Sequence, residues 1–241
     1  MLRLEQELAV NQGPLPDGKI SFDDLYDIGF QPFIGLTFEL NENMLLGLVY
    51  RAEADTDLEG DATFKNLAVP TPAIDEVDVS WDNPQWLEAG LRLKLSEQDI
   101  LAFNVGWQDW SVFSENRIGL SGGAFSPTAK LDRKWKDTWH AGIAYVHQFK
   151  SRSAGYSIGT SYDSSPVSDK NRTIDFPVDE TIKLSAYYFW KGPKEVDFAV
   201  GATLMHLGQA KIDQTSQGVR FTGDFDSNII LMVGTTLKRS F

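Results

Sequence analysis

The sequence contains no cysteine among its 241 residues, so neither a disulfide framework nor a thiolate metal site can be built from it. Basic residues are also scarce, because 22 Lys and Arg stand against 34 Asp and Glu, a formal net charge of −12. A protein that wraps nucleic acid needs clustered cations to neutralise phosphates. The charge balance therefore argues against a nucleic-acid partner.

Long apolar runs are missing as well. No segment approaches the roughly 18 consecutive apolar residues of a membrane-spanning helix, which excludes a helical membrane protein. Residues 1–10 carry acidic side chains and lack the basic start, apolar core and small-residue cleavage site of a secretory signal. An exported protein needs such a segment, so we expect the signal to have been removed or the mature start to lie elsewhere.

The pattern that is present is an alternation of apolar and polar residues with a period of two, in blocks of about ten residues. In 196–204, for example, the even positions are apolar and the odd positions are small or polar. An all-β protein is predicted. The expected strands number nine and lie near 29–40, 43–67, 86–95, 99–113, 137–149, 153–163, 180–190, 194–206 and 228–241, the second of them kinked around 53–60.

The connections between these strands alternate between tight turns and long loops, the latter at 68–85, 114–136, 164–179 and 207–227. Membrane barrels combine short turns at one end with long loops at the other. Aromatic residues gather near the predicted strand ends, as at a bilayer interface. These features favour an antiparallel transmembrane β-barrel. A soluble β-sandwich also alternates and remains the alternative.

Several segments carry a resemblance beyond this general pattern. The last strand is amphipathic and ends in Phe241, which resembles the signal that barrel-assembly machinery reads. Other matching segments are LGLVYRAE (46–53) with Leu58, Gly60 and Asp61, WQDWSVF (107–113), WKDT (135–138), and YDSSPV (162–167) with Asn171, Arg172 and Thr173. In order and spacing the chain resembles the FadL family of outer-membrane transporters of long-chain fatty acids and hydrocarbons.

The resemblance implies a fourteen-stranded barrel in the outer membrane, with an amino-terminal hatch that plugs the lumen and a lateral opening in the wall. It covers roughly the last nine strands. We therefore expect 1–28 to be the end of a preceding strand and an extracellular loop, and 29–241 to be the carboxy-terminal strands of one barrel domain. Nine strands do not close an even-numbered barrel, so we expect a fragment or a truncated product.

Catalytic chemistry finds no support in the sequence. The three histidines, His140, His147 and His206, lie in different predicted strands without the spacing of metal ligands. No Ser/His or Asp/His constellation can be assembled. We expect no enzyme, no metal and no cofactor.

Binding of a fatty acid would require cations near an apolar slot. The resemblance places Lys130 and Arg133, with Lys134 and Lys136 beside them, near the extracellular mouth, and Arg172 in a loop. Alternatively, the cluster pairs with Asp132, Asp137 and lipopolysaccharide phosphate. Arg172 could likewise brace its own loop against Asp163 or Asp169.

The apolar slot has its own candidates, which are inward-leaning residues that a water-filled pore would not favour. They are Val49, Trp110, Val146, Phe189, Met205, Ile230 and Met232. The predicted function is passive uptake of long-chain fatty acids through the outer membrane, in contact with its lipid and lipopolysaccharide. Uptake of aromatic or alkane hydrocarbons, and a structural or adhesive β-protein, remain alternatives.

Overall fold

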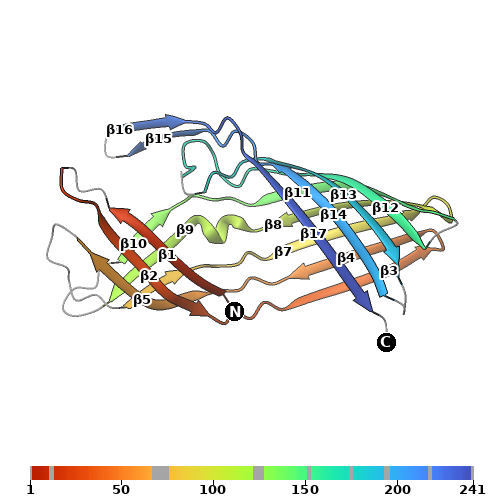
Figure 1. Cartoon of the computed structure of the whole chain (residues 1–241), viewed down its shortest axis with the longest axis horizontal. Coiled ribbons are helices and arrows are strands. Elements are labelled where there is room, and N and C mark those ends of the chain that lie inside the picture. The colour runs from red at the N-terminus through yellow and green to blue at the C-terminus, as the bar shows by residue number, and fades with distance from the viewer. Residues whose placement is uncertain are drawn as a thin grey trace. The chain divides into compact units, whose positions relative to one another are not determined.

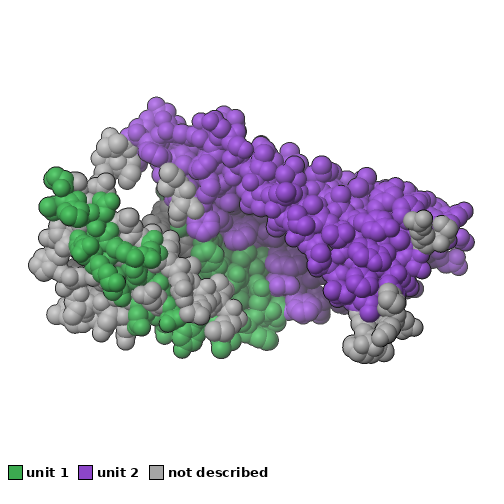
Figure 2. Space-filling model, in the orientation of Figure 1, with its two compact units in different colours: residues 1–32, 52–85, 111–134 green, residues 33–51, 86–110, 135–241 purple. Residues whose placement is uncertain are grey.

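The chain is almost entirely β in the computed structural model, which describes residues 2–10, 14–66, 76–121, 128–150, 153–173, 176–192, 196–216 and 219–239. It forms two compact units, shown in different colours in Figure 2. Unit 1 comprises Met1–Pro32, Ala52–Gln85 and Ser111–Lys134, and unit 2 comprises Phe33–Arg51, Trp86–Trp110 and Trp135–Phe241. No helix among the described residues is long and apolar enough to cross a bilayer.

Unit 2 is built on an antiparallel sheet of nine strands in the order β17-β14-β13-β12-β11-β8-β7-β4-β3 (Figure 1). The strands are β3 (Phe33–Asn41), β4 (Met44–Arg51), β7 (Trp86–Lys94), β8 (Asp99–Gln108), β11 (Thr138–Gln148), β12 (Ala154–Asp163), β13 (Thr181–Lys191), β14 (Val196–His206) and β17 (Ile229–Arg239). The nine predicted strands are confirmed to within a few residues, with two exceptions. The segment 43–67 holds both β4 and the separate β5, and the predicted strand 99–113 ends at Gln108 and is followed by the 3-10 helix η1 (Trp110–Ser114). Phe241 lies outside the described residues.

The register of the ladders divides the side chains of this sheet between two faces, because residues in register point to the same side. On the face that we call outer, Phe38, Leu46, Leu91, Phe103 and Ile143 form one cross-strand row. Many large apolar side chains of this face are exposed, among them Leu184 (60%), Leu231 (65%) and Val233 (72%). The opposite, inner face carries mainly small and polar residues with a few apolar ones, so the sheet has the apolar exterior of a membrane barrel wall.

Aromatic side chains border the outer face at both ends. Near the tight turns, Trp190 stacks on Phe198 with ring centroids 5.3 Å apart. At the other end, Trp139 lies 5.2 Å from Tyr162 and Trp107 donates a hydrogen bond to Asp137 at 3.0 Å. From Trp139 to Gln148, at the tight-turn end of β11, the strand rises by roughly 31 Å at about 3.4 Å per residue. At a tilt of about 40° that is close to the apolar band of an outer-membrane barrel.

Unit 1 contains a six-stranded antiparallel sheet in the order β1-β2-β5-β6-β9-β10. Its strands are β1 (Leu2–Val10), β2 (Gly18–Asp27), β5 (Asp57–Lys65), β6 (Glu76–Ser80), β9 (Glu115–Ser121) and β10 (Thr128–Asp132). Leu25, Leu58, Val77 and Phe113 are buried in this unit.

Four predicted connections are corrected, since each contains at least one strand. They are the second half of 1–28 and the loops 68–85, 114–136 and 207–227. The last contains the hairpin of β15 (Ile212–Ser216) and β16 (Val219–Gly223). Segments such as EVDVS and ENRIGLS are only five and seven residues long, so their alternation is too short to distinguish a strand from a loop in the sequence.

Candidate functional site

The predicted cationic cluster lies at the end of unit 1. Lys130 is in β10, in register with Arg117 of β9, and its side chain lies outside the described part of the structure. Arg133 follows that strand and is only 6% exposed. Its guanidinium lies 5.6 Å from the centre of the Phe113 ring, which in turn meets Trp81 edge-on at 5.0 Å. Arg133 is therefore a buried cation held on an aromatic support.

Arg172 is also buried, at 1% exposure. Its guanidinium donates to Asp169 (2.7 Å), to the carbonyl oxygens of Val178 (2.7 Å) and Lys211, and pairs with Asp179 at 2.8 Å. Hydrogen bonds to Ser165 and to the carbonyl of Val167 complete the set. The alternative role as a brace against Asp169 is confirmed. Asp163, the other suggested partner, pairs with Lys183 instead.

The predicted apolar residues of the strands share the inner face. Met205 is in register with both Lys183 and Ile230. Met232, two residues after Ile230 in β17, is in register with Thr203 of β14. These three apolar side chains therefore form one patch on β14 and β17. Val49, Val146 and Phe189 occupy other levels of the same face and do not join this patch.

Trp110 lies outside the sheet, in the 3-10 helix η1 (Trp110–Ser114). Its indole meets Trp135 edge-on at 5.5 Å and donates to Gln108 at 2.8 Å. Trp135 also packs against Phe176 at 5.9 Å. Trp110 therefore belongs to an aromatic cluster of its own, apart from the inner-face residues.

Beside the patch lies a polar row on the inner face that the sequence did not reveal. Asn104 donates to Glu88 at 3.3 Å, and His140 Nε2 lies 3.8 Å from the same carboxylate. Lys183 Nζ lies 2.9 Å from Asp163 Oδ2. Alternation in each strand marks these residues as inward, but their partners depend on cross-strand register, which one sequence does not give.

A hollow of about 390 Å³ lies on the inner face next to Lys183. Ser185 and Tyr187 share its wall, and both hydroxyls lie within hydrogen-bond distance of Thr203, at 2.9 and 3.2 Å. The Tyr187 ring lies across Gly201, since a Cβ atom at this position would overlap the ring. Most other residues of the wall are small or polar, and Phe103 and Ile143 are the large apolar exceptions.

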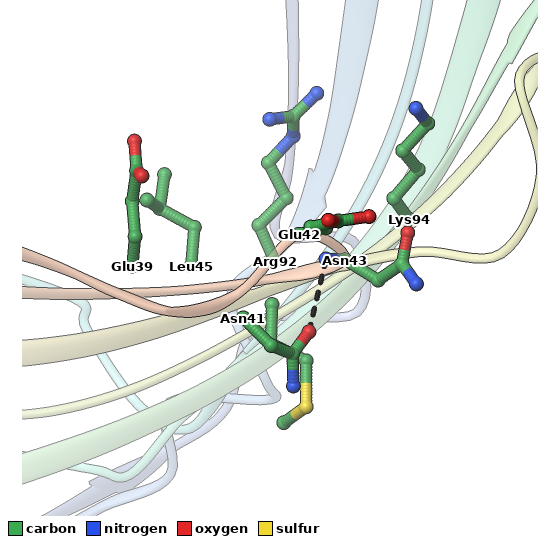
Figure 3. A pocket seen from close by; sticks show the side chains of 8 residues that line it. Glu39, Asn41, Glu42, Asn43, Leu45, Arg92 and Lys94 are labelled. Carbon is green, nitrogen blue, oxygen red and sulfur yellow. Dashed lines mark hydrogen bonds between the residues drawn. The ribbon is translucent and has the colours of Figure 1, made fainter.

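A second, smaller pocket of about 180 Å³ lies at the tight-turn end of β3, β4 and β7. Figure 3 shows Arg92 and Lys94 projecting side by side from β7, with Glu39 and Glu42 around them. Asn41 accepts a hydrogen bond from the backbone of Asn43 at 2.9 Å and closes the turn. The pocket is lined by side chains of both charges, which makes it a poor match for a hydrophobic ligand.

Comparison with known proteins places this geometry in context. The profile of the outer-membrane protein transport family (OMPP1/FadL/TodX) matches residues 11–241. The chain is 24% identical over 211 residues to a long-chain fatty acid transport protein of Salmonella typhi, covering 83% of this chain and 48% of that protein. Against the protein of that description from Escherichia coli O6:H1, identity is 21% over 239 residues, covering 94% of this chain and 53% of the other.

Among solved structures, a Pseudomonas aeruginosa FadL homologue superposes with a TM-score of 0.72 at 15% identity, covering 98% of this chain and 60% of that one. The CymD monoaromatic hydrocarbon channel gives 0.63 at 18% identity, with coverage of 83% and 56%. These likenesses concern the fold. The chain spans about half the length of the curated relatives that it matches.

Proposed function

Since the chain belongs to the outer-membrane protein transport family (OMPP1/FadL/TodX), we propose that it forms the carboxy-terminal part of the wall of a channel for hydrophobic molecules. The observation that carries the proposal is the two-faced sheet of unit 2, apolar outside and lined with small and polar residues inside. Such a wall suits a membrane outside and a passage inside. Transport is passive, and no bond is made or broken.

Long-chain fatty acids are the proposed substrate class. The curated relatives in two bacteria are long-chain fatty acid transport proteins, which supports this choice. The fold likeness to CymD, a monoaromatic hydrocarbon channel, supports hydrocarbons as the second candidate. The two classes differ in one chemical respect: only a fatty acid carries a carboxylate that needs a cation or hydrogen-bond donors.

The path of the ligand follows from the same proposal. It enters at the mouth near Lys130 and Arg133, moves along the inner face as a plug rearranges, and leaves sideways into the membrane. Neighbouring strands of the described nine-stranded sheet are paired along their length, for instance over ten residue pairs between β12 and β13. A lateral exit therefore belongs to another part of the barrel wall.

The experiment replaces Lys130 by Ala in the full-length protein and compares uptake of a sixteen-carbon fatty acid with that of its methyl ester. A charge-assisted contact contributes about 1.5–3 kcal/mol, so affinity for the acid should fall roughly ten- to hundredfold while the ester is unaffected. Arg133→Lys tests the second cation and keeps a charge on the aromatic support. The control is Lys150→Ala, which removes an exposed cation at a tight turn. Uptake of a monoaromatic hydrocarbon without uptake of the acid would favour the second candidate.

A further inference from the structure

Near the long-loop ends of β13, β14 and β17, the inner face contains a cation beside an apolar patch. Lys183 is in register with Met205, and Met205 with Ile230, so a charge and two apolar side chains follow one another across β13, β14 and β17. Ile230 and Met232 are 44% and 50% exposed. Adjacent strands lie about 4.8 Å apart, so the patch extends roughly 10 Å from the lysine. A ligand with an anionic head group and an apolar tail therefore fits here, with the head group at Lys183 and the tail over the patch.

We propose that Lys183 is a transit site for the carboxylate of a fatty acid, with Asp163 as an internal counter-ion that the ligand displaces. This inference rests on the proposed function and names a site within it. The first methylene groups of the ligand lie over Met205, Ile230 and Met232. The hydroxyl groups of Ser185 and Tyr187, on the wall of the hollow, supply further donors to the carboxylate.

The Lys183 ion pair has the properties that a displaceable partner requires. Its side chains are 32% and 29% exposed, so a ligand in the lumen can reach them. Asp163 Oδ2 lies 2.9 Å from Lys183 Nζ, yet it accepts no hydrogen bond of good geometry. An ammonium group has three donors, and Asp163 is its one ion-pair partner among the described residues. Exchanging one carboxylate for another therefore leaves the charge of Lys183 matched.

The displaced carboxylate has a neighbour to which it can turn. His140 is in direct register with Asp163 on the same face. The imidazole of His140 lies across Gly106, within 3.8 Å of Glu88. Competition from Asp163 keeps ligand binding weak, and a passage requires binding that is favourable enough to enter and weak enough to leave.

The test compares two single variants of the full-length protein, each measured with a sixteen-carbon fatty acid and with its methyl ester. Lys183→Met should weaken binding of the acid about tenfold and leave the ester unchanged. Asp163→Asn should do the reverse and tighten binding of the acid, because Lys183 loses its internal competitor. Lys183→Arg is the matched control, which keeps the charge and should keep the affinity for the acid.

A structural ion pair predicts a different result, namely that both variants lower barrel stability and affect acid and ester alike. That outcome, or weaker acid binding in both variants, would overturn the transit site. Heat-modifiable migration on a gel verifies that each variant is folded. Wild-type protein that takes up neither acid nor ester would refute the proposed function itself. Wild-type protein that takes up both, with variants indistinguishable from it, would refute only the role of Lys183.

Discussion

At the scale of single residues, burial separates cations that hold the protein together from cations that can meet a ligand. Arg172 is a cation like Lys183, but it is 1% exposed and its guanidinium is bound by protein groups. Lys183 is partly exposed on an open face. The position of a positive charge in the sequence therefore says less about its role than the groups that surround it.

Replacing Arg172 by Met should loosen the segments 164–180 and 207–216 while the nine-stranded sheet stays folded. The change leaves the Asp179 carboxylate and the carbonyl oxygens of Val178 and Lys211 without their donor. Loss of one partner of a buried pair costs about 3–5 kcal/mol, so cleavage in these segments by a protease should rise at least a hundredfold.

Arg172→Lys should not rescue the Met variant, because an ammonium group cannot reproduce the planar fork of a guanidinium. Lys170→Met is the matched control, as it removes an exposed cation two residues away. If cleavage is unchanged and fatty-acid binding is lost, Arg172 does not stabilise these segments and instead contributes to ligand binding.

At the scale of elements, the two faces of each strand of the nine-stranded sheet face different environments, lipid on the outside and the lumen on the inside. The nine-stranded sheet of unit 2 faces lipid on one side, and its alternation is strong. The hairpin β15–β16 obeys other rules: Asp213 accepts two hydrogen bonds from Arg220, at 2.8 and 3.0 Å. The Arg220 guanidinium holds the pKa of Asp213 below its ordinary value. The pair's contribution is thus complete above that ordinary value and is lost as the pH falls through the lowered one.

Adjacent positions of β3 provide a direct test of the two faces. Phe38 lies on the outer face in the row of Leu46 and Leu91, and Thr37 lies on the inner face opposite Gly47. Phe38→Arg should destabilise the full-length barrel by about 2–4 kcal/mol, because it places a charge near the middle of the bilayer. Thr37→Arg should cost far less, since it points into the lumen.

Unfolding in denaturant from lipid vesicles measures both variants of β3. Equal destabilisation by the two substitutions would mean that the faces are assigned wrongly. A greater cost for Thr37→Arg would mean that the inner face, and not the outer one, is packed against an apolar surface.

At the scale of the whole molecule, the nine-stranded sheet has two edges, β3 and β17. In lipid, each unpaired backbone group of an edge strand costs several kcal/mol. The 241-residue chain expressed by itself should therefore aggregate or fail to insert as a monomer into lipid vesicles. The full-length protein provides the control under the same conditions. A soluble, monodisperse monomer with a cooperative melting transition would contradict the membrane assignment.

The sequence alone determined the nine strands of the large sheet in unit 2 and the face to which their residues point, but neither the hairpin β15–β16 nor the place of Trp110 in η1. The strands and their faces both follow from a local period of two. Every lipid-facing strand has this period because its apolar side chains must all lie on one face. The tight turns at 41–42 and 96–98 were visible for the same local reason. The inward direction of Val49, Phe189 and Met205 followed from alternation alone.

Only the tertiary structure decided which strands pair, in what register, and what the long connections become. The contact between Asp163 and Lys183, the burial of Arg133 on Phe113 and the brace of Arg172 across to Lys211 each join residues far apart in the chain. A one-residue shift in register would move such partners to opposite faces, so a local pattern cannot specify them. Four strands of unit 1 escaped prediction because their alternation is short, as in β6, β9 and β10, or is interrupted, as in β2 between Asp23 and Tyr26.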